Sequence, residues 1–306
     1  MKDNKETYKG DPSELVQYFP KFNLQLLCCR YWWLKNWEYP QLDFPFWRVY
    51  YNSKKGGFIK YDNIEYEMLP NHVYLIAPNT SYSSHLFNHS IPKSSYVLNG
   101  GRISDLSSEL TNNFKKDDFI EHLFIHFTVG YPYDNIKPQI FVFELEDYLK
   151  TKVDFICKSL SKQAEKIDFS LFMAVQSLIL ELFFKMDSNI WNNSYKDERV
   201  GKAISFIENN LDRNISNEEL AQMTYMATNA FARLFKEETG ITIQKFIKNK
   251  KIKKACLFLL HTNYSIEMIT EKTGFANRYH FTRVFHEITG CSPIEYKKNY
   301  LVPTSL

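Results

Sequence analysis

The segment that decides the fold is residues 265–298, SIEMITEKTGFANRYHFTRVFHEITGCSPIEYKK. It opens on Ser265, a residue type that caps helices, and places Ile269 on an apolar side before a turn at 273–275. A second periodic stretch, 278–289, follows Asn277 and ends where a glycine can take a left-handed conformation. This order predicts a short helix, a tight turn and a second helix.

The end of the same segment predicts one more helix. Ser292 and Glu295 have the spacing of a capping box, in which each side chain bonds the backbone N–H of the other residue. Pro293 stands at the first helical position, where the missing N–H of proline costs nothing. We therefore expect a helix that begins at about residue 293.

The pattern recurs 50 residues earlier, in residues 216–247, SNEELAQMTYMATNAFARLFKEETGITIQKFI. Self-similarity at a fixed offset indicates two copies of one structural unit. At that offset Arg233, Phe235, Glu237, Thr239 and Gly240 recur identically as Arg283, Phe285, Glu287, Thr289 and Gly290.

The first copy has matching signals. Ser216 and Glu219 predict a capping box, and Ala221 supplies a small residue where two helices cross closely. A second helix is expected over 228–239, with buried aromatic residues on one side and polar and basic residues on the other. A long helix over 243–260, rich in lysine, joins the two copies as a rigid connector.

Charge is unevenly distributed along the chain. The whole sequence has a net charge of +3, with 38 Lys and Arg against 35 Asp and Glu. From Lys196 onward we count 17 basic and 12 acidic residues, a net of +5. A basic C-terminal third suits a nucleic-acid partner, although the excess is too small to decide the function by itself.

Residues 216–247, the run KKIKKACLFLL at 250–260 and residues 265–298 together closely resemble the DNA-binding domain of the AraC/XylS family. The resemblance covers roughly the last 100 residues. The sequence departs from the family pattern at several positions, among them Ala227, Lys251 and His286. The resemblance implies two helix-turn-helix units whose recognition helices enter successive major grooves of one duplex, ~34 Å apart.

Residues that the resemblance places at the DNA fall into two groups. Side chains toward base edges are expected to come from Asn229, Ala232, Arg233, Arg278, Tyr279, Thr282 and Arg283. Contacts to phosphates are expected from Lys236, Lys251 and His286. Arg233 and Arg283 are the strongest candidates for base recognition, because a guanidinium can bond guanine O6 and N7 together.

The first 145 residues show a different pattern. Short alternating runs, such as 46–51 and 73–77, are separated by turn residues, which predicts a β-sandwich or barrel. The stretch 46–86 and the later strand EHLFIHF (121–127) resemble the cupin-type sensor barrel that accompanies this DNA-binding domain in many relatives. This implies a ligand-sensing domain over 1–145.

A small-molecule pocket is expected inside that barrel. His122, Phe124 and His126 alternate on one face of a strand and would line it together with Trp47. A sugar or another small polar ligand would suit aromatic faces with polar groups. No metal site is expected, because metal-dependent cupins use an H-x-H pair that is absent here, and Ser83 stands near the position of a further histidine. No cofactor and no catalytic residue are predicted.

The middle of the chain changes to helical periodicity. Residues 147–161 and 168–185 predict two helices, and the second carries an apolar stripe that packs on the β-domain, forms a dimer seam, or does both. We place a helical linker at 146–195, with a hinge at 187–197, and the DNA-binding domain at 196–306. The fold class is therefore α+β multidomain: a cupin-like barrel, a helical linker and an all-α domain with two helix-turn-helix units.

The function expected from these features is that of a ligand-controlled, homodimeric transcription regulator that binds promoter DNA. Activation, through contact with RNA polymerase, is expected more than repression. Five scattered cysteines, and no signal peptide or membrane span, favour the cytoplasm. The alternative is an enzyme, either a cupin isomerase or an alkyl-transfer repair protein, with an appended DNA-binding domain.

Overall fold

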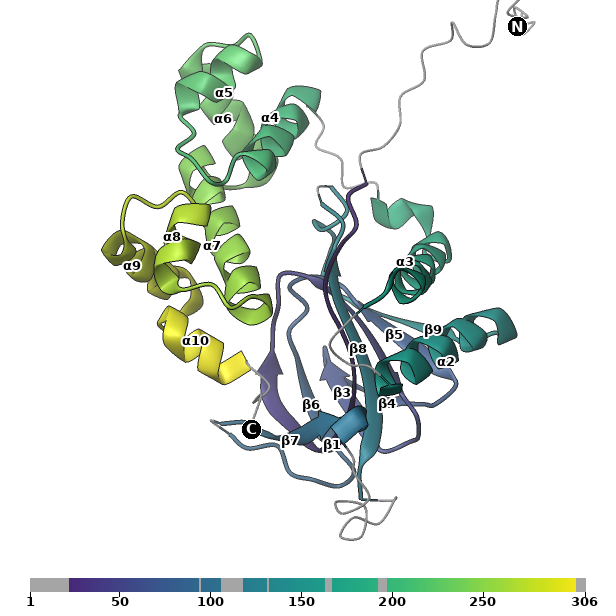
Figure 1. Ribbon diagram of the computed structural model, residues 1–306. Coiled ribbons are helices and arrows are strands. Elements are labelled where there is room, and N and C mark those ends of the chain that lie inside the picture. Colours follow the sequence, from purple (N-terminus) through teal and green to yellow (C-terminus); the bar gives the residue numbers. More distant parts are fainter. Residues whose placement is uncertain are drawn as a thin grey trace, which may run out of the picture.

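The computed structural model describes residues 22–93, 95–105, 118–130, 132–162, 167–191 and 197–300. The N-terminal 21 residues and the expected boundary at 195–196 lie outside the described residues. Figure 1 shows a curled sheet with one pair of helices on one side and the C-terminal helices on the other. The coarse prediction of an α+β chain with a helical C-terminal domain is confirmed.

The sheet is antiparallel and has nine strands, in the order β4-β3-β6-β1-β8-β2-β5-β9, with β7 also paired to β1. The strands are β1 (Gln25–Leu42), β2 (Trp47–Asn52), β3 (Gly57–Tyr61), β4 (Ile64–Met68), β5 (His72–Ile76), β6 (Tyr82–Leu86), β7 (Val97–Arg102), β8 (Ile120–Thr128) and β9 (Ile140–Glu144).

The sheet has two buried faces, which explains why strands such as β2 are buried at every position. In β2, Trp47 and Val49 belong to the core cluster on the face that the helices between residues 147 and 184 cover, here called the outer face. Tyr50, and Phe46 just before the strand, belong to the cluster on the opposite, inner face. Successive side chains of a strand point to opposite faces, so the two clusters follow directly from the alternation.

Helices α2 (Asp147–Lys162) and α3 (Phe169–Phe184) cover the outer face of the sheet. The apolar stripe of α3 is buried in the same cluster as the outer residues of β2 and β8. Its buried members are Leu171, Val175, Leu178, Ile179, Leu182 and Phe183. Of the two roles considered for this stripe, packing on the sheet is therefore the one observed. A short 3₁₀ turn, η3 (Ser188–Trp191), follows, and another, η2 (Ile103–Asp105), follows β7.

The C-terminal region is entirely helical. It contains α4 (Glu198–Asn209), α5 (Asn217–Met223), α6 (Thr228–Thr239), α7 (Ile243–His261), α8 (Ile266–Lys272), α9 (Arg278–Thr289) and α10 (Pro293–Tyr300). The bounds predicted for the helices now labelled α6 and α9 agree with the structure. The predicted start of α10 is also confirmed: Ser292 and Glu295 each accept a hydrogen bond from the backbone N–H of the other.

The C-terminal helices are not separate from the sheet. Residues of α7, α8, α9 and α10 share one hydrophobic cluster with the inner face of the sheet. Tyr96, just before β7, donates a hydrogen bond of 2.8 Å to the carbonyl oxygen of Lys298 in α10. At the end of α7, the ring of His261 lies 5.2 Å from that of Phe46. Among the helices described, none combines the length and the apolar composition needed to cross a membrane.

Candidate functional site

Helix α6 has a buried aromatic side and a polar outer side. Phe231 and Phe235 are fully buried in the core formed with α4 and α5. On the outer side Asn229, Arg233 and Lys236 are exposed, and Ala232 between them is half-buried. The small alanine leaves room for a surface to approach the helix closely.

Helix α9 repeats this arrangement. Phe281 and Phe285 are fully buried, while Arg278, Arg283 and His286 are exposed and Thr282 is half-buried. Tyr279 is 91 % exposed, which is unusual for an aromatic side chain with no partner to cover it. The Arg278 guanidinium donates a 2.6 Å hydrogen bond to the carboxylate of Glu267 in α8, which uses one of its N–H donors.

The two outer helices, α6 and α9, differ in the residue at their N-cap. Asn277 accepts a hydrogen bond from the N–H of His280 at 2.8 Å and so caps α9. Ala227 occupies the corresponding position before α6 and offers no side-chain cap. Both helices end at a glycine with positive φ, 75° at Gly240 and 78° at Gly290, as the sequence predicts.

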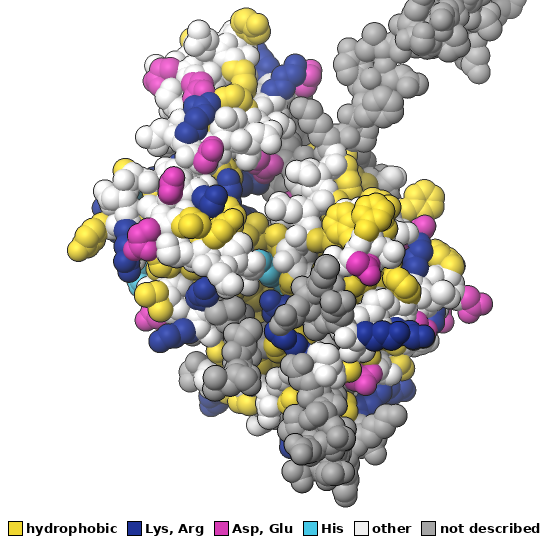
Figure 2. Space-filling view, in the orientation of Figure 1, with side chains coloured by type: hydrophobic (Ala, Val, Ile, Leu, Met, Phe, Trp, Pro, Cys, Tyr) yellow, Lys and Arg dark blue, Asp and Glu magenta, His cyan; other side chains and the backbone are white. Residues whose placement is uncertain are grey.

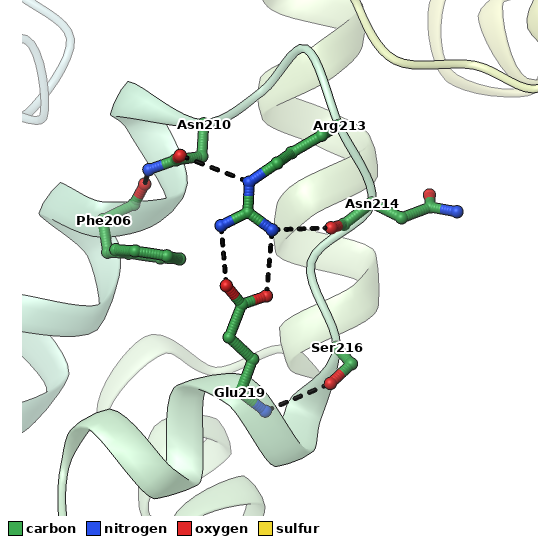
Figure 3. Close-up of polar contacts among 6 residues, drawn as sticks. All are labelled: Phe206, Asn210, Arg213, Asn214, Ser216 and Glu219. Atoms are coloured by element: carbon green, nitrogen blue, oxygen red, sulfur yellow. Dashed lines mark hydrogen bonds and ion pairs between the residues drawn. The ribbon is translucent and has the colours of Figure 1, made fainter.

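A bidentate ion pair fixes the approach to α5, as Figure 3 shows. The Arg213 guanidinium donates to both carboxylate oxygens of Glu219, at 2.6 and 3.1 Å, and also to the Asn214 carbonyl. This hydrogen bonding lowers the pKa of the Glu219 carboxyl. Ser216 accepts from the N–H of Glu219, but the carboxylate is turned to Arg213, so only half of the predicted capping box forms.

The side chain of Lys251 is not exposed, as a contact with a DNA phosphate would require. Its side chain is buried, and its Nζ donates a 2.7 Å hydrogen bond to the carbonyl oxygen of Gly274. Burial also lowers the pKa of this ammonium group. The prediction that Lys251 touches DNA is therefore corrected: it joins α7 to the turn between α8 and α9.

The charge on the C-terminal helices is mixed. On the face drawn in Figure 2, lysine and arginine side chains over these helices are interspersed with acidic ones. No block of one sign covers the C-terminal helices on that face.

Comparison with known proteins assigns the C-terminal region. A family model described as a helix-turn-helix domain matches residues 220–299. Over 102 residues the chain is 30 % identical to the arabinose operon regulatory protein of Escherichia coli (strain K12), covering 33 % of this chain and 35 % of that protein. The C-terminal domain is an AraC-family DNA-binding domain.

Another relative of this AraC-type domain is the HTH-type transcriptional regulator YfiF of Bacillus subtilis (strain 168), 36 % identical over 94 residues, which is 31 % of this chain and 30 % of that protein. The chain therefore matches about a third of the length of these relatives. A similar solved structure is that of ToxT from Vibrio cholerae, with a TM-score of 0.47 and 13 % identity, covering 91 % of this chain and 98 % of that one.

The region outside the AraC-type domain contains a small, partly open cavity of about 70 Å³. Its wall is mostly aromatic and comes from the inner faces of β1, β2 and β8, with Leu98 of β7. The lining residues are Trp32, Leu34, Trp37, Tyr39, Leu42, Phe44, Tyr50, Leu98, His122, Phe124 and His126. Three of the four residues predicted for a ligand pocket, His122, Phe124 and His126, lie here.

The polar groups of this cavity are held among aromatic rings. His122 pairs through Nδ1 with the amide oxygen of Asn52 at 2.6 Å, and burial lowers the pKa of its imidazole to about 3. The hydroxyls of Tyr50 and Tyr82 lie 2.9 Å apart. A neutral imidazole and phenol groups can orient a ligand by hydrogen bonds.

Trp47 does not line the cavity, so its prediction as a ligand-binding residue is corrected. Its ring is fully buried on the outer face of the sheet, 4.9 Å from the ring of Phe183 in α3. Its neighbour Arg48 faces the inner side instead, with its guanidinium 5.2 Å from the ring of Phe44 and 4.9 Å from that of Tyr82. Side chains of β2 alternate between the two faces, so the inner face receives Arg48 and not Trp47, which explains the error.

Proposed function

We propose that this protein is a sequence-specific, DNA-binding transcription regulator. The observation that carries the proposal is the pair of helices α6 and α9, each anchored by two buried phenylalanines and each presenting exposed polar and basic residues outward. Helices of this kind fit the major groove, where arginine distinguishes guanine from the other bases.

Within this proposal, α5–α6 and α8–α9 are two helix-turn-helix units, and α7 sets the distance between them. A helix of 19 residues is ~28 Å long, close to one turn of B-DNA at ~34 Å. The organisation remains a ligand-sensing domain at 1–145, of cupin-like type, a linker at 146–195 and a DNA-binding domain at 196–306, acting on promoter DNA in the cytoplasm.

The regulatory partners belong to the same proposal. We expect a small molecule in the barrel, a homodimer and, in the more common case of activation, contact with RNA polymerase. A cavity of about 70 Å³ is smaller than a sugar needs, so aromatic side chains of its wall would have to move when such a ligand enters.

A dimer is supported by apolar side chains that α3 does not bury on the sheet. Phe169 and Phe184 are 76 % and 87 % exposed, and Met173 and Leu180 lie exposed between them. At helical spacing these four residues form a stripe on the side of α3 opposite to the buried stripe. Exposed apolar stripes of this kind commonly mark contact surfaces.

Two buried thiols of the described residues do not favour the alkyl-transfer alternative. An alkyl-transfer protein needs an activated thiolate, but burial raises the pKa of the Cys256 thiol to about 12 and that of Cys29 well above its usual value. The proposal is tested by titrating the purified chain against genomic fragments at ~50 and ~200 mM salt. Sequence-dependent enrichment at the higher salt supports it, and uniform binding that vanishes there contradicts it.

A further inference from the structure

Three potential metal ligands meet where the sheet contacts α7. They are the thiol of Cys28 in β1, the imidazole of His126 in β8 and the imidazole of His261 at the end of α7. One ligand atom from each lies within 4.8 Å of the others. Two ligands thus come from the N-terminal sheet and one from the AraC-type domain.

The backbone of β1 is irregular at this place. The register between β1 and β8 shifts between Leu26 and Cys28, which indicates a bulge. As a result Leu27 and Cys28 both pack toward the inner face, whereas Leu26 and Cys29 pack toward the outer one. A bulge redirects one side chain out of strict alternation. Here it turns the thiol of Cys28 toward its cross-strand neighbour His126.

The two histidines have no polar partner in the part of the chain that is described. Both ring nitrogens of His126 and both of His261 are buried and make no hydrogen bond. The rings instead contact each other, at 5.4 Å, and the ring of Phe46, at 4.9 and 5.2 Å. Buried polar atoms without partners are costly, so four such atoms in two adjacent rings call for a ligand that would satisfy them.

We propose that Cys28, His126 and His261 bind a thiophilic divalent cation of the zinc type between the sheet and α7. One thiolate and two imidazoles are ligands that Zn²⁺ prefers, and three protein ligands leave a fourth position for water or a small anion. Zinc bonds of ~2.0–2.3 Å separate the ligand atoms by roughly 3.5 Å, so each would move inward by under about 1 Å.

Two guanidinium groups lie near the three ligands: Arg30 acts electrostatically on Cys28, His126 and His261, and Arg48 acts on His126. Arg48 faces His126 across β2 and β8, but its guanidinium is directed to the Thr80 carbonyl, at 3.1 Å, and to the rings of Phe44 and Tyr82. The Cys28 thiol loses its proton to solvent when the cation binds, and the resulting thiolate neutralises one of the two added charges.

A cation at this position would connect the N-terminal sheet to the AraC-type domain. It would tie β1 and β8 to α7, the helix that joins the α5–α6 pair to the α8–α9 pair. His126 also lines the aromatic cavity, so ligand entry and metal binding would share one side chain. Any resulting change in DNA affinity rests on the proposed function, whereas the binding of metal does not.

The test uses the full chain, reduced and stripped of metal, titrated with Co²⁺ as a spectroscopic probe and then with Zn²⁺ as competitor. We expect one ion per chain, visible ligand-field bands and a thiolate-to-cobalt charge-transfer band. Cys28→Ser removes the charge-transfer band, and His126→Gln or His261→Gln weakens binding by more than about 100-fold, beyond the loss caused by removing an outer-shell partner.

Cys291→Ser and His286→Gln are matched controls from outside the cluster. Both variants should bind Co²⁺ and Zn²⁺ as the parent chain does. Because a variant can fail to fold, far-ultraviolet circular dichroism accompanies each titration, and Zn²⁺ should raise the Tm of the parent chain but not that of His261→Gln. Absence of stoichiometric binding by the parent chain, or binding that the three variants leave unchanged, overturns the proposal. Uptake of Cu⁺ alone overturns the assignment to a divalent cation. No DNA is present, so these outcomes are independent of the proposed function.

Discussion

The Nζ of Lys251 donates a 2.7 Å hydrogen bond to the carbonyl oxygen of Gly274, so a lysine of α7 stabilises the turn between α8 and α9. The ammonium also lies 5.5 Å from the centre of the Phe275 ring. A lysine in an AraC-type domain can therefore have a structural role, although its charge alone would suggest a contact with phosphate.

Substitutions of Lys251 and Lys236 should distinguish a structural role from a contact with phosphate. Lys251→Met removes the donor to Gly274 and should lower the free energy of unfolding by ~1–3 kcal/mol while the salt dependence of DNA binding stays unchanged. Lys236→Ala, on the exposed side of α6, should leave stability unchanged and reduce the salt slope by about 1. Denaturant unfolding and DNA titration over a salt series measure both. The opposite pattern would show that Lys251 contacts phosphate.

Gly274 should tolerate no side chain. Its φ is +61°, and an added Cβ would lie 2.5 Å from the backbone carbonyl carbon of Asp212. Gly274→Ala should therefore destabilise the domain by more than the ~1–2 kcal/mol expected from backbone conformation alone. Gly240→Ala is the matched control, because its φ is +75° but nothing lies within 4 Å of the added atom. Equal losses of Tm in the two variants would refute the steric argument.

The uncapped start of α6 offers a gain in stability. Ala227 has extended backbone at the N-cap position but provides no acceptor. Ala227→Ser should raise the free energy of unfolding by ~0.5–1 kcal/mol, and Asn277→Ala should lower it by a similar amount in α9. Chemical denaturation measures both variants. If the serine gives no gain while the Asn277 variant loses stability, the start of α6 is not limited by its cap.

Arg283 on α9 should recognise a base. Arg283→Ala is expected to weaken binding to a specific site by ~1–3 kcal/mol and to affect random DNA much less. Competition titrations with the two kinds of DNA measure the difference, and Lys236→Ala supplies the control for a loss that is uniform across sequences. If Arg283→Ala weakens binding to both DNAs equally, the side chain touches only the backbone of the duplex.

The exposed stripe of α3 should control the oligomeric state. Leu180→Asp together with Phe184→Asp places charges in the proposed contact and should convert a dimer to a monomer with unchanged helix content. Ile64→Asp on β4, which alters another exposed apolar residue, is the control. Analytical ultracentrifugation measures the mass. A parent chain that is monomeric at micromolar concentration would contradict the homodimer.

Local sequence signals were enough to predict much of the secondary structure of the AraC-type domain. Ser265, Asn277 and Gly290 begin or end helices through bonds to backbone groups a few residues away, so the bounds of α9 could be predicted from the sequence. The repeat at an offset of 50 residues likewise predicted that α6 would share the pattern of α9. These features depend on neighbours along the chain, which the sequence displays directly.

Only the tertiary structure decided which polar side chains are buried and which elements meet. Lys251 is buried because α7 packs beside the α8–α9 turn, and Trp47 faces α3 because of the way β2 alternates within the sheet. Cys28, His126 and His261 come from three elements spread over most of the chain, and a bulge in β1 helps to direct the thiol. Contacts of this kind depend on packing between segments that are distant in the sequence, so they could not be predicted from local patterns of residues.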